Sequence, residues 1–224
     1  MNTQIGTIDV GQLKQKLLQR KNMKNRFRLP LSFENAKVAL KVAVEVEVMS
    51  RFGTFDFSKD VDSQLSKMAK WLTAEKQKFG MMFCGGVGNG KTSLMKAFQS
   101  LLNALNIRNE NDTMACRPYS IRIVDAKTIV EQYQANRQEF IGMKRCEMLG
   151  IDDMGIETLE IMEYGNVHTP IIDLLSTRYE NQLFTIVSTN LTPSQIRERY
   201  GERIADRFNE MMERIIFKNP TYRH

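Results

Sequence analysis

The stretch "GGVGNGKT" at residues 85–92 constrains the fold more than any other part of the sequence. It fits the pattern G-x-x-x-x-G-K-[ST] in full and stands between a short apolar run and a segment with a helical pattern. Glycines let such a loop wrap around phosphate groups with successive backbone N–H groups pointing inward. The helix that follows adds its N-terminal N–H groups and the positive end of its dipole. The pattern therefore predicts a phosphate-binding loop between a β-strand and an α-helix.

This pattern also predicts the type of ligand, a nucleoside triphosphate such as ATP together with Mg²⁺. Lys91 is expected to reach the β- and γ-phosphates, and the hydroxyl of Thr92 is expected to complete the Mg²⁺ shell. The candidate nucleotide-binding residues are Gly85, Gly86, Val87, Gly88, Asn89, Gly90, Lys91, Thr92 and Ser93.

Two carboxylates end a second apolar run, "EMLGIDD", at residues 147–153. Loops at the carboxyl ends of parallel strands converge on ligands, and buried charges without partners are costly, so a purely structural role explains these acids poorly. Asp152 is the candidate metal carboxylate, and Asp153 is the candidate base that orients the attacking water.

A third apolar run, "LFTIVSTN", ends in the polar residues Ser188, Thr189 and Asn190. Asn190 is the best candidate to contact the γ-phosphate or the attacking water. An alternative role for Asn190 is to cap the next helix, although Thr192 before Pro193 is a better cap.

From residue 80 onward, short apolar runs alternate with segments of helical pattern. Helices of ten or more residues between strands imply crossovers, so an α/β fold with a mostly parallel, buried, five-stranded sheet is expected. The expected strands are 80–85, 120–125, 147–152, 183–189 and 214–218. The expected helices are 91–106, 127–141, 168–181 and 193–212.

The N-terminal part of the chain is strongly basic. Residues 1–30 hold seven of the 32 basic side chains and one of the 26 acidic ones, which leaves 25 of each in the rest. We interpret residues 1–30 as an arm that touches nucleic acid or an acidic partner, or as a solvated terminus. A possible helix at 8–18 aligns Ile8, Leu13 and Leu17, a stripe expected to dock a client protein.

Residues 31–58 are expected to form a linker and helical segment before a nucleotide-binding domain at 59–224. "RLPLS" at 28–32 contains Pro30 and has the pattern of a linker. Residues 41–48 alternate as a strand would, but the length and alanine content of the surrounding segment favour a helix. A further amphipathic helix is expected at 60–77.

Several classes are disfavoured by the sequence. The N-terminal residues contain no apolar stretch of signal-peptide length, and no apolar run approaches the roughly 18 residues of a membrane span, so a cytoplasmic protein is expected. The three cysteines, Cys84, Cys116 and Cys146, are expected to be reduced thiols, and two histidines offer little for a zinc site.

Four segments, in their order and spacing, resemble the DnaC/IstB-type AAA+ ATPases, a group that includes helicase loaders and the ATPase subunits of some transposons. They are "FCGGVGNGKTSL", "LGIDDMG", "IVSTNLTPSQIRERYGERIADRFNEM" and "IIFKNPTYRH". The resemblance covers about residues 60–223. It implies a three-layer AAA+ fold, a hydrolysing site with Asp152 and Asp153 as the second acidic motif, and Asn190 as the first sensor.

The resemblance also implies an arginine finger, at Arg207 or Arg203, that acts on ATP bound by a neighbouring subunit. All the arginines of this region, including Arg197 and Arg199, are alternatively helix-surface charges paired with nearby acids, and that interpretation is favoured for Arg197 and Arg199. Asp153 stands where many AAA+ enzymes have glutamate, which predicts slow hydrolysis stimulated by a partner or DNA. Only about seventeen residues follow Arg207, so the helical lid domain is expected to be absent.

The implied function is that of an ATP-dependent homo-oligomer that controls a replicative DNA helicase, with single-stranded DNA as a further ligand. The alternative is an ATPase that polymerises on duplex DNA and regulates a transposase. A small-molecule P-loop kinase is a distant third hypothesis, because "STN" and "GERIADRF" have no evident role in binding an acceptor.

Overall fold

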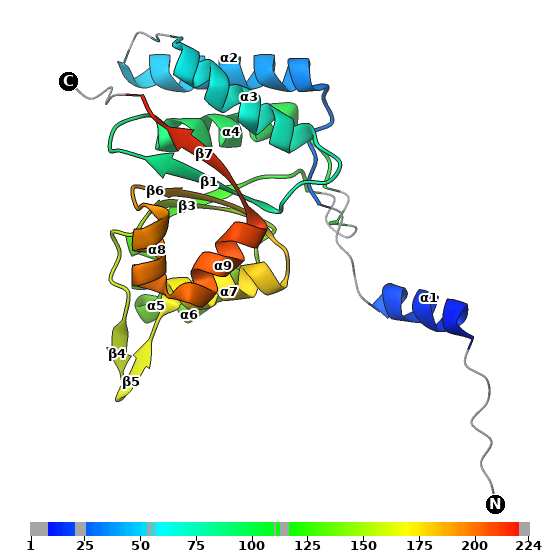
Figure 1. Cartoon of the computed structure of the whole chain (residues 1–224), viewed down its shortest axis with the longest axis vertical. Coiled ribbons are helices and arrows are strands. Elements are labelled where there is room, and N and C mark those ends of the chain that lie inside the picture. The colour runs from blue at the N-terminus through cyan, green and yellow to red at the C-terminus, as the bar shows by residue number, and fades with distance from the viewer. Residues whose placement is uncertain are drawn as a thin grey trace, which may run out of the picture.

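The computed structural model describes residues 9–20, 26–52, 55, 57–109, 111–112 and 117–219. Helices cover both faces of a central β-sheet, and a small β-hairpin projects from the side opposite α2 and α3 (Figure 1). Cys116 and Ile8 lie outside the described residues. Within the described part of the chain, no helix has the length and apolar character needed to cross a bilayer.

The central sheet has five strands, and every pairing within it is parallel. This confirms the expected α/β fold. Each parallel pairing requires the chain to cross back over the sheet, which the helices between strands provide. In spatial order the strands are β2 (Arg122–Asp125), β3 (Met148–Met154), β6 (Phe184–Thr189), β1 (Gly80–Gly85) and β7 (Met212–Phe217).

Alternating side chains on the strands build two hydrophobic cores, one on each face of the sheet. On β1, Met81 and Phe83 enter the core shared with α2, α3 and α4, whereas Met82 enters the core shared with α5, α7, α8 and α9. All three side chains are almost fully buried. This is the pattern of a strand covered on both sides, which explains why β1 is a continuous apolar run.

Five helices that follow strands cover the second core, and α4 covers the first core together with α2 and α3. Their bounds are α4 (Lys91–Leu105), α5 (Ala126–Ala135), α6 (Arg137–Arg145), α7 (Pro170–Glu180), α8 (Pro193–Tyr200) and α9 (Glu202–Met211).

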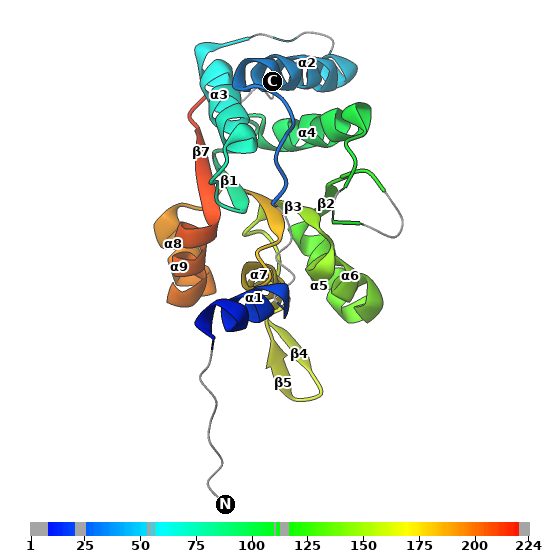
Figure 2. The same ribbon diagram turned by 90° about the vertical axis from the view of Figure 1, so that its right-hand side faces the viewer.

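Two segments that we expected to be single helices are each divided. Residue Asn136 interrupts the segment 127–141, and its side-chain oxygen accepts a hydrogen bond from the N–H of Glu139 to begin α6. Gly201 interrupts the segment 193–212 with a φ of 84°, which an L side chain rarely adopts. Both breaks separate short helices that pack at different angles around the sheet (Figure 2).

The hairpin of β4 (Ile161–Glu163) and β5 (Asn166–His168) was not predicted. Its two turn residues, Tyr164 and Gly165, have φ values of 50° and 79°. Two successive positive φ values suit a tight hairpin, but tyrosine is not among the residue types that predict such a turn from sequence. His168, inside the expected helix 168–181, belongs to this hairpin, and the helix begins at Pro170.

The N-terminal segment forms α1 (Val10–Arg20), α2 (Phe33–Phe52) and α3 (Lys59–Thr73). The helical interpretation of residues 41–48 is therefore confirmed. The linker expected at 28–32 is wrong for Leu29, which is 1% exposed and whose N–H donates to the carbonyl of Leu72. Apolar contacts outweigh the turn signal of Pro30 here.

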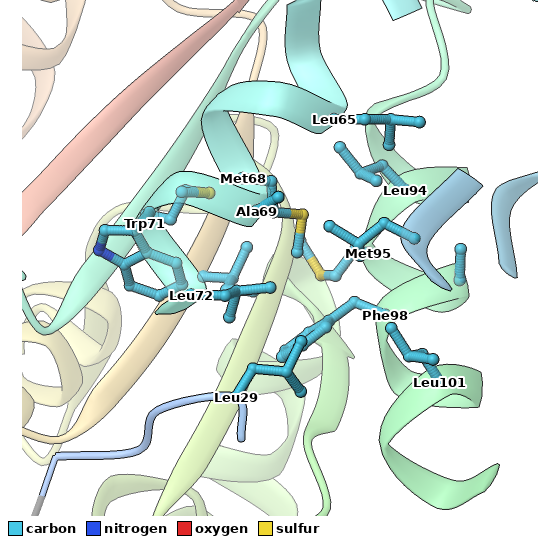
Figure 3. Close-up of a cluster of buried hydrophobic side chains, with 14 of the residues drawn as sticks. Leu29, Leu65, Met68, Ala69, Trp71, Leu72, Leu94, Met95, Phe98 and Leu101 are labelled. Carbon is cyan, nitrogen blue, oxygen red and sulfur yellow. The ribbon is translucent and has the colours of Figure 1, made fainter. Parts of the chain in front are cut away.

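A dense cluster joins α3 to α4 on one face of the sheet (Figure 3). Trp71 is 5% exposed and donates from its indole N–H to the carbonyl of Lys78 at 2.9 Å. Its ring packs 5.1 Å from that of Phe184 on β6. Trp71 is thus a core residue that ties α3 to the sheet. The other labelled members of the cluster are Leu29, Leu65, Met68, Ala69, Leu72, Leu94, Met95, Phe98 and Leu101.

A fully buried guanidinium, that of Arg178 on α7, holds together three segments on the opposite face. It donates to the carbonyls of Met143, Cys146 and Phe184 at 3.1, 2.8 and 2.6 Å, and to the hydroxyl of Thr185 at 2.9 Å. Burial lowers the pKa of Arg178 to about 10, so it remains charged at neutral pH. Its partners are neutral, and hydrogen bonds replace the water it has lost.

Replacement of Arg178 by leucine is expected to lower the free energy of unfolding by about 3 kcal/mol or more, because buried carbonyls would be left without donors. Urea unfolding monitored by circular dichroism measures this loss. The control Arg197→Leu removes a half-exposed arginine paired only with Glu202 and is expected to change stability by less than about 1 kcal/mol. Equal effects of the two substitutions would contradict the role of Arg178.

Candidate nucleotide-binding site

The predicted phosphate loop connects β1 to α4 at the carboxyl edge of the sheet, where β3 and β6 also end. Gly88 and Gly90 have φ values of 78° and 93°, so the loop uses the backbone freedom of glycine at two places. A Cβ atom at Gly85 would lie 2.4 Å from the carbonyl oxygen of Phe217 on β7. The loop is therefore fitted closely against the neighbouring strand.

Lys91 is the first residue of α4, is 5% exposed, and points back into the loop. Its ammonium donates to the carbonyls of Gly85 and Gly86 at 2.9 and 2.6 Å, and to the side-chain oxygens of Asn89 and Asn190 at 3.1 and 2.8 Å. Lys91 follows the loop after β1 and Asn190 follows β6, and these two strands are neighbours in the sheet, so the structure brings the two residues together. These acceptors are oxygen atoms, the same type of ligand that a phosphate group would present.

The alternative role of Asn190 as a helix cap is not observed. Thr192 is the N-cap of α8, and it forms a reciprocal capping box with Gln195. Asn190 therefore remains available to the loop, where it contacts Lys91.

The candidate metal ligands also lie together. The hydroxyl of Thr92 donates to Oδ1 of Asp152 at 3.0 Å, and the hydroxyl of Ser188 donates to the same oxygen at 2.5 Å. A threonine hydroxyl beside a carboxylate offers the hard oxygen ligands that Mg²⁺ prefers, with further ligands left to water and substrate phosphates. Among the described residues, no group of three or more histidine, cysteine or acidic side chains is gathered as a metal site.

A β-bulge at the end of β3 shapes the position of Asp153. Ile151 pairs with Val187 and Met154 with Thr189, so three steps on β3 match two on β6. Asp153 has a φ of 51°, and its N–H donates to the hydroxyl of Ser188 at 2.8 Å. Bulges re-aim side chains beside functional sites. Asp153 therefore departs from the regular alternation that it would follow in an unbroken strand.

Glu157 is a site-supporting residue that the sequence analysis did not identify. Its side chain is fully buried and accepts hydrogen bonds from the N–H of Gly155 at 2.7 Å and the hydroxyl of Tyr200 at 2.5 Å. Burial and this contact with the carboxylate raise the pKa of Tyr200. The loop after β3 is therefore anchored to α8.

Arg199 takes part in the same anchor. It lies 3.7 Å from the carboxylate of Glu157 and also donates to its carbonyl oxygen. Its interpretation as a helix-surface charge is thus wrong, because a buried carboxylate attracts it. Arg197, in contrast, pairs with Glu202 at 2.7 Å on the surface, as expected.

A buried chain of amide side chains supports the loop from its other side. Gln64 on α3 donates to Asn219 at 2.8 Å, and Asn219 donates to the carbonyl of Asn89 at 2.8 Å. Asn89 in turn donates to the carbonyl of Phe217 at 3.1 Å. The sequence carries no local signal for these contacts, because their members are about 130 residues or more apart. The last motif of the resemblance extends into residues 220–224, which lie outside the described residues.

The two candidate arginine fingers have different surroundings. Arg203 is exposed and has no ion-pair partner within the described part of the chain. The side chain of Arg207 is 11% exposed, lies 3.3 Å from Glu180, and packs 4.8 Å above the ring of Tyr179. Arg207 is thus engaged within its own subunit.

Next to the loop, Cys84 at the end of β1 is partly buried, and burial raises the pKa of its thiol. Cys84 and Cys146, the cysteines among the described residues, are both free thiols.

Comparison with known proteins shows the fold. No family model matches the chain, and no curated protein matches it at a significant level. Among solved structures, the DnaC helicase loader is 20% identical with a TM-score of 0.53, and the alignment covers 75% of this chain and 95% of that one. DnaI is 19% identical with a TM-score of 0.55, and the alignment covers 76% of this chain and 89% of that one. AMPPCP-bound DnaA from Aquifex aeolicus is 16% identical with a TM-score of 0.50, and the alignment covers 72% of this chain and 48% of that one.

These likenesses confirm the expected three-layer α/β fold, with its mostly parallel sheet. The DnaC and DnaI chains match over nearly their whole length, whereas the DnaA chain extends well beyond the matched part. At these identities the likeness concerns the fold alone.

The glycines of the loop provide a matched test of its close fit against β7. Gly85→Ala is expected to lower the free energy of unfolding by about 2–3 kcal/mol, because its Cβ would overlap a backbone oxygen. A Cβ atom at Gly86 would meet no atom within 4 Å, so Gly86→Ala is expected to change the free energy of unfolding by less than about 0.5 kcal/mol. Urea unfolding of both variants measures the difference. A Gly85→Ala variant as stable as Gly86→Ala would show that the loop does not rest on β7.

Proposed function

We propose that this protein is an ATPase that binds Mg-ATP at the loop of residues 85–93 and hydrolyses it slowly. The observation that carries the proposal is the meeting of Lys91, Asn190, Thr92 and Asp152 at one edge of the sheet. The structural likeness to AMPPCP-bound DnaA supports the choice of ligand, since AMPPCP is an ATP analogue.

The residues would divide the work as follows. Lys91 exchanges its loop and Asn190 acceptors for phosphate oxygens and neutralises their charge. Thr92 and Asp152 hold Mg²⁺, which stabilises charge on the phosphates when it is bound. Asp153 orients the attacking water and accepts its proton, while Asn190 contacts the γ-phosphate or that water. Most of the rate enhancement then comes from positioning and electrostatics.

Arg203 is the arginine that we assign to the ATP of a neighbouring subunit. The exposed guanidinium of Arg203 has no ion-pair partner among the described residues and can reach across a subunit interface, whereas Arg207 would first have to leave Glu180 and Tyr179. Supplying this charge from a neighbour makes hydrolysis depend on assembly of the homo-oligomer.

Mixing two inactive variants tests this assignment. Lys91→Ala and Arg203→Ala are each expected to lower ATP hydrolysis about a hundredfold or more, through loss of phosphate binding and of transition-state charge. An equimolar mixture is expected to recover activity, because an intact loop meets an intact arginine at some interfaces. Phosphate release measures the rate. A mixture as inactive as its components would contradict action in trans.

The same assay has a matched control. Arg207→Lys retains a positive charge near Glu180 and is expected to leave hydrolysis within about threefold of the parent protein. A loss as large as that of Arg203→Ala would transfer the role of the finger to Arg207.

We further propose that the partner is a replicative DNA helicase, with single-stranded DNA as a second ligand. The likeness of the whole domain to the DnaC helicase loader supports this choice over the alternatives. The runner-up is a transposition-type ATPase that polymerises on duplex DNA. A small-molecule kinase is a distant alternative and predicts phosphate transfer to an acceptor above background hydrolysis.

Co-elution separates these hypotheses. The purified protein and the replicative helicase of the same cell are expected to elute as a complex with ATP, and the complex is expected to weaken with ADP. Sedimentation with duplex and single-stranded DNA is measured in parallel. Absence of a helicase complex together with ATP-dependent filaments on duplex DNA would support the transposition-type alternative instead.

A further inference from the structure

Helix α2 carries apolar side chains on two sides, yet only one of these sides is covered. Ala36, Leu40 and Val44 are buried against the domain. The remaining side carries the α2 ridge, which we define as Val38, Val42, Val46 and Met49. These four side chains keep between 50% and 61% of their surface exposed.

Their spacing places the α2 ridge along a single line of about 16 Å. A continuous apolar ridge on an exposed helix face marks a contact site. The α2 ridge therefore needs a partner that the domain itself does not supply.

Helix α1 carries a second uncovered set of apolar side chains. The α1 stripe consists of Val10, Leu13 and Leu17, whose exposed fractions lie between 44% and 74%. An isolated helix of this length, with a glycine at position 11, is only marginally stable in water. Figure 1 shows α1 standing apart from the sheet and its covering helices. The α1 stripe thus also needs a partner, and docking would stabilise the helix.

The two surfaces complement each other in length and charge. Val10 to Leu17 spans about 10 Å, which fits within the α2 ridge. Helix α1 contains three basic residues and no acid. Glu34 and Glu45 flank the α2 ridge without an ion-pair partner among the described residues, and the nearby Lys41 packs 4.0 Å over the ring of Phe57.

The path of the chain favours a contact between different molecules. Arg26 donates to the carbonyl of Gln77 at 2.5 Å and to the side chain of Gln182 at 2.8 Å. Phe27 and Leu29 are buried beyond it. The segment that follows α1 is therefore fixed beside the start of β6. In both figures α2 lies on the far side of the sheet from α1.

We propose that the α1 stripe of one molecule packs on the α2 ridge of a second copy of this chain. Each molecule then contributes one stripe and one ridge, so the contact is head-to-tail and propagates into a ring or a filament. In this proposal the α1 stripe binds a second copy of the chain and not the client protein that the sequence analysis expected. The contact uses no residue of the loop at 85–93, so it can be tested without nucleotide.

Sedimentation velocity of the full-length protein without nucleotide tests the contact. The parent protein is expected to self-associate with increasing concentration. Leu13→Asp/Leu17→Asp and Val42→Asp/Val46→Asp each place charges in the apolar contact and are expected to weaken association at least about thirtyfold. All four positions are exposed, so the fold is expected to remain intact, which circular dichroism checks.

An equimolar mixture of the two variants is the decisive sample. The intact stripe of one variant and the intact ridge of the other are expected to form a dimer that cannot grow. The control Gln12→Asp/Gln15→Asp adds the same charge to the polar side of α1 and is expected to associate like the parent protein.

Three outcomes would overturn the proposal. A parent protein that stays monomeric means that the stripe binds its own chain or a foreign partner. Stripe and ridge variants that associate as the parent does mean that another surface is used. A mixture that remains monomeric means that the two surfaces do not contact each other. ATP binding and hydrolysis are measured separately, so a failure of this contact is distinguished from a failure of the proposed nucleotide site.

Discussion

A buried ammonium group must be surrounded by oxygen acceptors, and Lys91 obtains its acceptors from two segments of the chain. The loop supplies the carbonyls of Gly85 and Gly86 and the amide of Asn89, while β6 is followed by Asn190. That arrangement requires β1 and β6 to be neighbours with their carboxyl ends at one edge, which only a parallel sheet with helical crossovers provides. The layered fold can thus be understood as the support for one charged contact.

Much of this support can be predicted from local patterns. The loop, the strand positions and the convergence of Asp152 and Asn190 follow from glycine spacing and from apolar runs that end in polar residues. Features that depend on distant partners were not predictable. Glu157 lies in a stretch of ordinary loop composition, and only its meeting with Tyr200 and Gly155 makes it an anchor. The bulge at Asp153 likewise depends on how β6 pairs, not on the sequence of β3.

Helix boundaries show the same division. The helical pattern continues through Asn136 and Gly201, so the sequence suggests two long helices where the structure has four shorter ones. At each break the backbone leaves the helical conformation, with the capping side chain of Asn136 or the positive φ of Gly201 to accommodate it. The linker expected around Pro30 failed for a related reason. Its apolar residues Phe27 and Leu29 find places in the core that a pattern of turn residues cannot reveal.

The amide chain through Asn219 has a consequence for how the protein matures during synthesis. The phosphate loop rests on β7 and on Asn219, which is 130 residues further along the chain than Asn89. A nascent chain that has already formed α3, β1 and α4 still lacks this support, since contacts between distant segments form late. The loop therefore reaches its final shape only after residue 219 has left the ribosome. Incomplete chains would consequently carry the whole motif without the contacts that hold it in place.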